Sequence, residues 1–113
     1  AIAAVDDLRR LALALPGATE VVYRGDPWFN VGTKTFALIS NGRPILKLDP
    51  AHQELLFEIR PDTFQPCKVA TVHWSYVEIG HLDVAELEAL LVEAWTRVVP
   101  KKVSRPYLAA RQP

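Results

Sequence analysis

Residues 25–48, GDPWFNVGTKTFALISNGRPILKL, decide the fold because they place short apolar segments between two tight turns. Gly32-Thr33 is a Gly-X pair that suits a two-residue hairpin, and Asn41-Gly42 is the strongest short-range hairpin signal. The stretch therefore predicts an antiparallel meander, with strands at residues 28–31, 34–40 and 43–48.

Two amphipathic helices are predicted on either side of this meander. Residues 4–15 carry leucine and alanine at helical spacing, and Pro16-Gly17 ends the pattern. Asp49-Pro50 combines an N-cap residue with a proline in the first helical turn, so a second helix is predicted from there to Arg60. The inward face of this second helix is predicted to hold Leu55, Leu56 and Ile59.

Two further strands and a third helix complete the pattern. Residues 19–23 are rich in β-branched and aromatic side chains, as are residues 72–79, VHWSYVEI. Asp83 and Glu86 have the spacing of a capping box for a helix that ends at Pro100. This order of elements predicts an α+β two-layer sandwich, in which an antiparallel sheet carries three helices packed mainly on one face.

The length and composition fit a single globular domain of 113 residues. Residues 1–103 are assigned to this domain, and residues 104–113 to a C-terminal tail that is either an ordered strap held by Tyr107 and Leu108 or a mobile end. The single cysteine, Cys67, excludes an internal disulfide, so a cytoplasmic location is predicted. The sequence has no apolar run long enough to predict a membrane span.

The two turns also predict which side chains share a face of the sheet, because side chains alternate along a strand. One face, predicted to be open, holds Phe29, Val31, Lys34, Phe36, Leu38, Ile45 and Lys47, and Trp74 and Tyr76 are grouped with it. The opposite face is predicted to lie under the helices and holds Trp28, Asn30, Thr35, Ala37, Ile39, Leu46 and Leu48. A slip of one residue in either turn would reverse this grouping.

Aromatic rings and cations on one sheet face can bind nucleic acid, with bases stacked on the rings and phosphates paired with the cations. The candidate residues for such a site are Lys34, Arg43, Lys47, Phe29, Phe36 and Trp74. The alternative interpretation is that the rings fill the core and that the cations at the turns serve solubility. The formal net charge is +0, so a nucleic-acid site would need a local cluster of cations.

Motifs for catalysis and metal binding are not found in the sequence. It contains no nucleophile elbow, phosphate-binding glycine loop or zinc-protease motif. His52, His73, His81 and Cys67 do not have the spacing of a metal site, so no cofactor is predicted. A protein without enzymatic activity is therefore expected.

Several short stretches together resemble the MmcQ/YjbR-like family of small bacterial proteins. They are LPGATE (15–20), GDPWFNVGTKTFAL (25–38), LKLDP (46–50), HW (73–74) and PKK (100–102). The resemblance implies a CyaY-like α+β fold and a proposed DNA-binding role through a "double wing". By position, the matching motifs include Phe29, Lys34, Phe36, Lys47 and Trp74.

Two functions are expected from these observations. The first is DNA binding by a monomer or homodimer that does not associate with a membrane. The alternative is a domain, monomeric or homodimeric, that uses the same face to bind a small molecule or a protein and has no catalytic activity.

Overall fold

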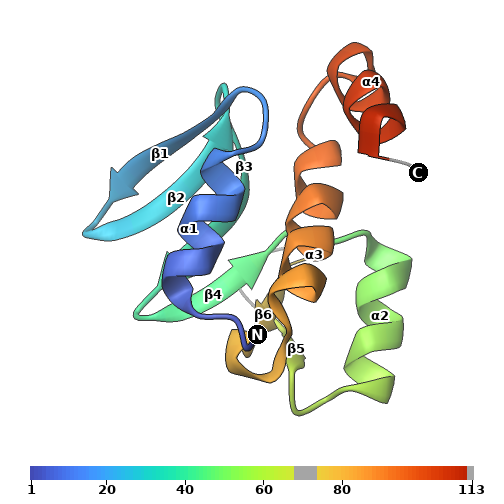
Figure 1. The fold of residues 1–113 in the computed structure, drawn as a ribbon. Helices are drawn as coiled ribbons and strands as arrows, with labels where there is room; N and C mark the ends of the chain where they lie inside the picture. The colour runs from blue at the N-terminus through green and yellow to red at the C-terminus, as the bar shows by residue number, and fades with distance from the viewer. Residues whose placement is uncertain (68–73, 112–113) are drawn as a thin grey trace.

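A six-stranded antiparallel sheet forms one layer of the protein (Figure 1). The computed structural model describes residues 1–67 and 74–111. The strand order across the sheet is β1-β2-β3-β4-β6-β5, so β1 and β5 lie at its two edges. The strands are β1 (Ala18–Tyr23), β2 (Asp26–Val31), β3 (Lys34–Ser40), β4 (Arg43–Leu46), β5 (Phe64–Pro66) and β6 (Ser75–Val77).

The helices form the second layer, and the expected α+β sandwich is confirmed. The helices are α1 (Val5–Leu13), α2 (Pro50–Ile59), α3 (Val84–Thr96) and α4 (Lys101–Arg111), with a short 3-10 turn at Ile79–His81. Figure 1 shows α1 and α3 side by side against the sheet. The predicted caps are present: Asp49 accepts a hydrogen bond from the His52 N–H at 3.2 Å, and Asp83 forms a capping box with Glu86. None of the helices described here is long and apolar enough to cross a membrane.

The last helix, α4, was not predicted. Pro106 lies inside it, and residues 104–111, predicted as part of a tail, are helical. Tyr107 packs edge-to-face on Trp95 of α3 with ring centroids 4.9 Å apart, which fixes α4 against the domain. The predicted strand at 72–79 is shorter, because β6 ends at Val77; residues 72 and 73 lie outside the described part of the chain.

Three two-residue turns connect the first four strands. Asn41-Gly42 has positive φ at both residues, as expected, and Gly32 has φ of 62°. The third turn was missed in the sequence: Arg24 and Gly25 have φ of 52° and 84°, which is a type I′ pattern. The strand β2 therefore begins at Asp26, two residues before the predicted strand at residues 28–31.

A β-bulge in β3 changes the predicted register. Two-residue turns without a bulge would pair Val31 with Lys34, Phe29 with Phe36 and Trp28 with Ala37. In the structure Val31 does face Lys34, but Phe29 faces Ala37 and Trp28 faces Leu38. Phe36 is the additional residue on β3, and the register shifts at this point. The bulge divides each predicted face in two, because the alternation of side chains changes phase between β2 and β4.

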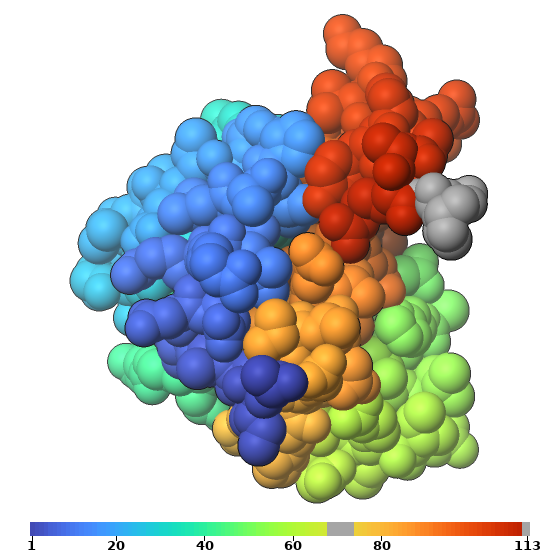
Figure 2. Space-filling view, viewed as in Figure 1, coloured from blue at the N-terminus to red at the C-terminus, as the bar shows by residue number. Residues whose placement is uncertain are grey.

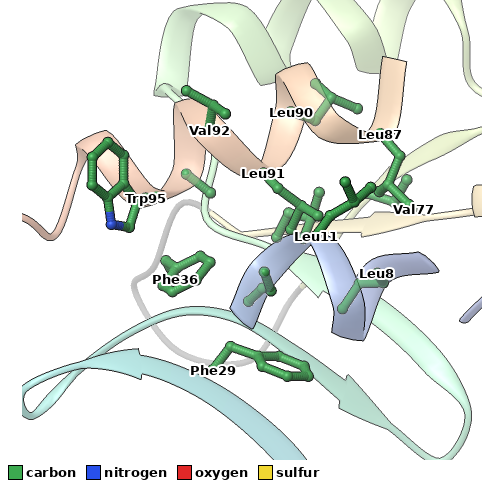
Figure 3. Packing of buried hydrophobic residues seen from close by; sticks show 14 of the residues in the cluster. Leu8, Leu11, Phe29, Phe36, Val77, Leu87, Leu90, Leu91, Val92 and Trp95 are labelled. Carbon is green, nitrogen blue, oxygen red and sulfur yellow. The ribbon is translucent and has the colours of Figure 1, made fainter. Parts of the chain in front are cut away.

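The core lies between the helices and the sheet (Figure 3). Phe29 and Phe36, predicted on the open face, are both fully buried in it, and Trp28, predicted under the helices, lies on the opposite face with Leu38. Trp95 of α3 is also fully buried, and its indole N–H donates to the Pro16 carbonyl at 2.9 Å.

The inward face of α2 also differs from the prediction. Leu56 is buried, but Leu55 and Ile59 are 51% and 59% exposed. Gln53 takes the inward position instead, and its side-chain oxygen accepts a hydrogen bond from the buried Ser75 hydroxyl at 2.6 Å. A polar residue can face the core here because Ser75 satisfies it.

Candidate nucleic-acid interface

The sheet face opposite the helices carries a second, smaller apolar cluster. Leu38, Ile45 and Cys67 are its buried members, and Trp28, Trp74 and Tyr76 pack around them while staying partly exposed. None of these six residues comes from a described helix. We call this side of the sheet the outer face.

Cations lie over the aromatic rings of the outer face. The Arg43 guanidinium carbon is 3.8 Å from the centroid of the Tyr76 ring, and the Lys47 ammonium nitrogen is 5.9 Å from that of Trp74. Arg43 is the first residue of β4 and Tyr76 lies on β6, its neighbour in the sheet. Each pair places a cation against the electron-rich face of a ring.

A third group continues the row to the edge of the sheet. The Arg24 guanidinium carbon is 5.3 Å from the centroid of the Tyr23 ring. Tyr23 in turn packs edge-to-face on Trp28, with ring centroids 5.2 Å apart. Rings and cations therefore run across the outer face from β1 to β6.

Tyr76 remains a neutral phenol in this arrangement. Its interaction with the Cys67 side chain is the main cause that raises the pKa of Tyr76 above its ordinary value of 10.0; burial adds to the effect and Arg43 opposes it. The hydroxyl therefore keeps its proton at neutral pH. The positive charge of Arg43 is not cancelled by a phenolate beneath it.

The neutral net charge conceals an uneven distribution of charges. On the helix side, three arginines are paired with carboxylates: Arg9 with Glu20 at 3.0 Å, Arg60 with Glu86 at 3.0 Å and Arg111 with Glu88 at 3.2 Å. Within residues 1–67 and 74–111, seven cations have no carboxylate within salt-bridge distance: Arg24, Lys34, Arg43, Lys47, Lys101, Lys102 and Arg105. Three of the seven, Arg24, Arg43 and Lys47, lie against the rings described above.

The structure brings together half of the predicted site. Arg43, Lys47 and Trp74 meet on the outer face. Lys34 is exposed at the β2–β3 turn beside Val31, which packs against the main core, so it lies away from this group. Phe29 and Phe36 cannot contact a ligand without unfolding, because their exposed fraction is 0%.

Two partly exposed rings of the outer-face cluster, Tyr76 and Trp28, were not among the candidate residues. Tyr76 had been placed on the open face, but its contact with Arg43 was not predicted. Trp28 had been placed under the helices. The bulge is what moved Trp28 to the outer face. The sequence does not reveal the bulge, because residues 36–39 are all apolar and either set of alternating side chains could be the buried one.

The remaining candidate groups have structural partners. The His52 Nδ1 lies 2.7 Å from a Glu93 carboxylate oxygen, and the His81 Nδ1 lies 3.2 Å from the Thr63 hydroxyl. His73 lies outside the described residues. In the part of the chain that is described, no three His, Cys, Asp or Glu side chains are grouped to hold a metal ion.

A small pocket opens beside Arg43 and Tyr76, and Gln65 and Glu78 also line it. Its volume of about 50 Å³ is well below the roughly 300–1,000 Å³ of typical small-molecule sites. The Arg43 guanidinium donates to the Gln65 side-chain oxygen at 3.4 Å across one side of it. The pocket therefore belongs to the surroundings of Arg43 and does not enclose a ligand of that size.

Comparison with known proteins shows the family and the fold of this chain. The chain is similar in structure to Deinococcus radiodurans protein DR2400, whose domain is DUF419, with 28% sequence identity and a TM-score of 0.75 over 96% of this chain and 89% of that one. No curated protein matches the sequence. The model of the YjbR family matches residues 13–97, which include the whole sheet, α2 and α3. This chain belongs to the YjbR family.

Proposed function

We propose that this protein binds DNA through the outer face of its sheet. The observation that carries the proposal is the position of Arg43 and Lys47 against Tyr76 and Trp74 on a face that none of the described helices contributes to. Cations supply the contacts to phosphates, and exposed rings supply platforms on which bases stack.

The contact geometry leaves both chemical groups available. The N–H groups of a guanidinium lie in its own plane and point outward from its edge when it lies over a ring. Arg43 can therefore donate to a phosphate without leaving Tyr76. The ammonium of Lys47 stands 5.9 Å from the Trp74 centroid, which is a loose contact that a base can replace. Because a duplex keeps its bases inside, stacking favours single-stranded over double-stranded DNA on this face.

The proposal also includes the absence of catalysis and a cytoplasmic location. Binding, not catalysis, is proposed, because His52 and His81 are engaged in contacts between elements of the fold. The single cysteine favours a reducing, cytoplasmic compartment, where DNA is accessible in a bacterium.

The test is the salt dependence of binding to single-stranded and duplex oligonucleotides of the same sequence. Replacing both cations, Arg43→Gln with Lys47→Gln, should weaken binding and lower the slope of log affinity against log salt by about 1.4 for a single strand, since two phosphate contacts are lost. The matched control is Lys101→Gln with Lys102→Gln, which removes the same charge from α4.

Two results would contradict the proposal. One is the absence of binding by the unmodified protein at low salt. The other is an equal loss of affinity in the α4 control, which would show that total charge rather than the outer face determines binding.

A further inference from the structure

The strand β1 is an unprotected edge of the sheet. It has six residues, and its exposed side chains Val21, Val22 and Tyr23 have exposed fractions of 47%, 67% and 50%. Its pairing with β2 is regular along its whole length, without a bulge. Edge strands are usually blocked by proline, charged side chains or a bulge. The strand β1 has no proline and no bulge, and its one charged residue, Glu20, is paired with Arg9.

The register shows which backbone groups of β1 are unpaired. In a two-residue hairpin, the residues that flank the turn exchange both backbone hydrogen bonds, and here these are Tyr23 and Asp26. The pairs then alternate, so Val22 and Pro27 form a pair whose backbone groups point away from each other. Pro27 has no N–H and fits this position. The N–H and C=O of Val22, and by the same alternation those of Glu20, therefore point to the free side of the sheet.

We propose that β1 pairs antiparallel with β1 of a second copy of this chain, about a twofold axis at Val22. In an antiparallel pair, residues with outward backbone groups face each other in the hydrogen-bonded pairs, and residues with inward groups face each other in the pairs between them. Symmetric registers centred on Glu20, Val21 or Val22 satisfy this rule. The register at Glu20 opposes two carboxylates, and the one at Val21 places Glu20 against Val22 of the partner subunit. The register at Val22 avoids both contacts: Glu20, which is already paired with Arg9, stands opposite Arg24 of the partner subunit, and the exposed apolar residues of the two strands face one another.

The side chains are self-complementary in this register, as an isologous interface requires. Val22 faces Val22 of the partner subunit, and Val21 faces Tyr23 of the partner subunit. Because Tyr23 packs on Trp28, the outer faces of the two copies become continuous across the axis. The dimer would join two six-stranded sheets into one, and it does not depend on nucleic-acid binding.

Sedimentation velocity across a range of concentrations tests the dimer. We expect a species of twice the 12.6 kDa chain mass that dissociates on dilution. Val22→Lys places two like charges at the axis and should give a monomer at concentrations where the unmodified protein is dimeric. The control Leu55→Lys changes a similarly exposed residue on α2 and should remain dimeric. A protein that is monomeric throughout, or a Val22→Lys variant that dimerises normally, would overturn the proposal.

Crosslinking tests the register itself. Facing residues in a hydrogen-bonded antiparallel pair have Cα atoms about 5.5 Å apart, which is within disulfide range. Val22→Cys should therefore form a covalent dimer under mild oxidation, and Leu55→Cys should not. Equal crosslinking of the two variants would contradict the register.

The two proposals fail separately. The Val22→Lys monomer keeps Arg43, Lys47 and both rings, so it should still bind a short single-stranded oligonucleotide. Loss of DNA binding together with an intact dimer would contradict only the proposed function.

Discussion

The two faces of the sheet use similar side chains but differ in what covers them. On the helix side, Phe29, Phe36 and Trp95 are fully buried, and among the described residues no buried side-chain polar atom is left without a partner. On the outer face, Trp28 and Tyr76 remain partly exposed, and Arg43 lies over one of the rings. The comparison shows that large rings alone do not distinguish the covered face of the sheet from the uncovered one. Partial exposure of the rings and cations lying over them mark the outer face.

The largest expected difference between the faces is in stability. Phe36→Ala should lower the free energy of unfolding by about 3–5 kcal/mol, because a fully buried ring leaves a cavity. Trp74→Ala should cost about half as much or less, because a partly exposed ring loses less apolar contact. Urea denaturation followed by circular dichroism measures both; Phe36→Leu serves if the alanine variant does not fold. Equal losses at the two sites would show that the outer face is part of the core.

A buried polar contact gives a smaller effect on the helix side. Ser75→Ala should cost about 1–3 kcal/mol, because the Gln53 side-chain oxygen loses its donor inside the core. The control Ser40→Ala, at a half-buried position on β3, should change stability by no more than about 0.5 kcal/mol. The same denaturation experiment compares them, and a Ser75→Ala variant as stable as the control would contradict the assigned role of this hydrogen bond.

Tryptophan fluorescence can separate the two faces without measuring stability. The three tryptophans are Trp28 and Trp74 on the outer face and Trp95 in the core. Single-stranded DNA should quench the emission of the unmodified protein. A Trp28→Phe, Trp74→Phe double variant, which keeps only Trp95, should show no change. Quenching that persists in this double variant would place the binding surface elsewhere.

The smallest expected effect is on the pH dependence of stability, through the carboxyl groups at the start of α3. Hydrogen bonding to the N-terminal ammonium lowers the pKa of Asp83 from 3.8, and the Asp83 backbone N–H lowers that of Glu86 from 4.5. A carboxyl group whose pKa is lower in the folded protein than in the unfolded chain stabilises the fold at any pH above its unfolded pKa. This stabilisation is lost as the pH falls below about 4. Asp83→Asn should therefore show a shallower loss of thermal stability between neutral and acid pH. An unchanged pH profile would show that the start of α3 does not depend on this charge.

The sequence predicted most of the fold because its strongest signals are local. Asn41-Gly42, Gly32-Thr33 and the caps at Asp49 and Asp83 form turns and helix ends through neighbouring residues alone. The helix α4 was missed because its basic sequence, interrupted by Pro106, has weak helical character. Its packing depends on the distant Trp95.

The candidate site was predicted only in part for a related reason. Arg43 begins β4 and Lys47 directly follows it, so the Asn41-Gly42 turn sets the face on which both lie. Trp74 directly precedes β6, and it meets Lys47 on the outer face as the grouping predicted. Phe29 and Trp28 lie beyond the bulge, where the phase of alternation depends on packing under α1 and α3 rather than on local residues. The side chain of Gln53 likewise faces inward because of Ser75, which is distant in sequence.

The bulge at Phe36 also has a consequence for comparing relatives. It lets two consecutive residues of β3, Phe36 and Ala37, both face the helix-side core. A relative with one residue fewer between the equivalents of Gly32 and Ala37 would lose one of these two inward side chains, whereas its Trp28 and Phe29 equivalents would keep their faces, because Phe29 faces Ala37 and Trp28 faces Leu38. Alignments in this strand should therefore be judged by the position of the gap and not by identity of the rings.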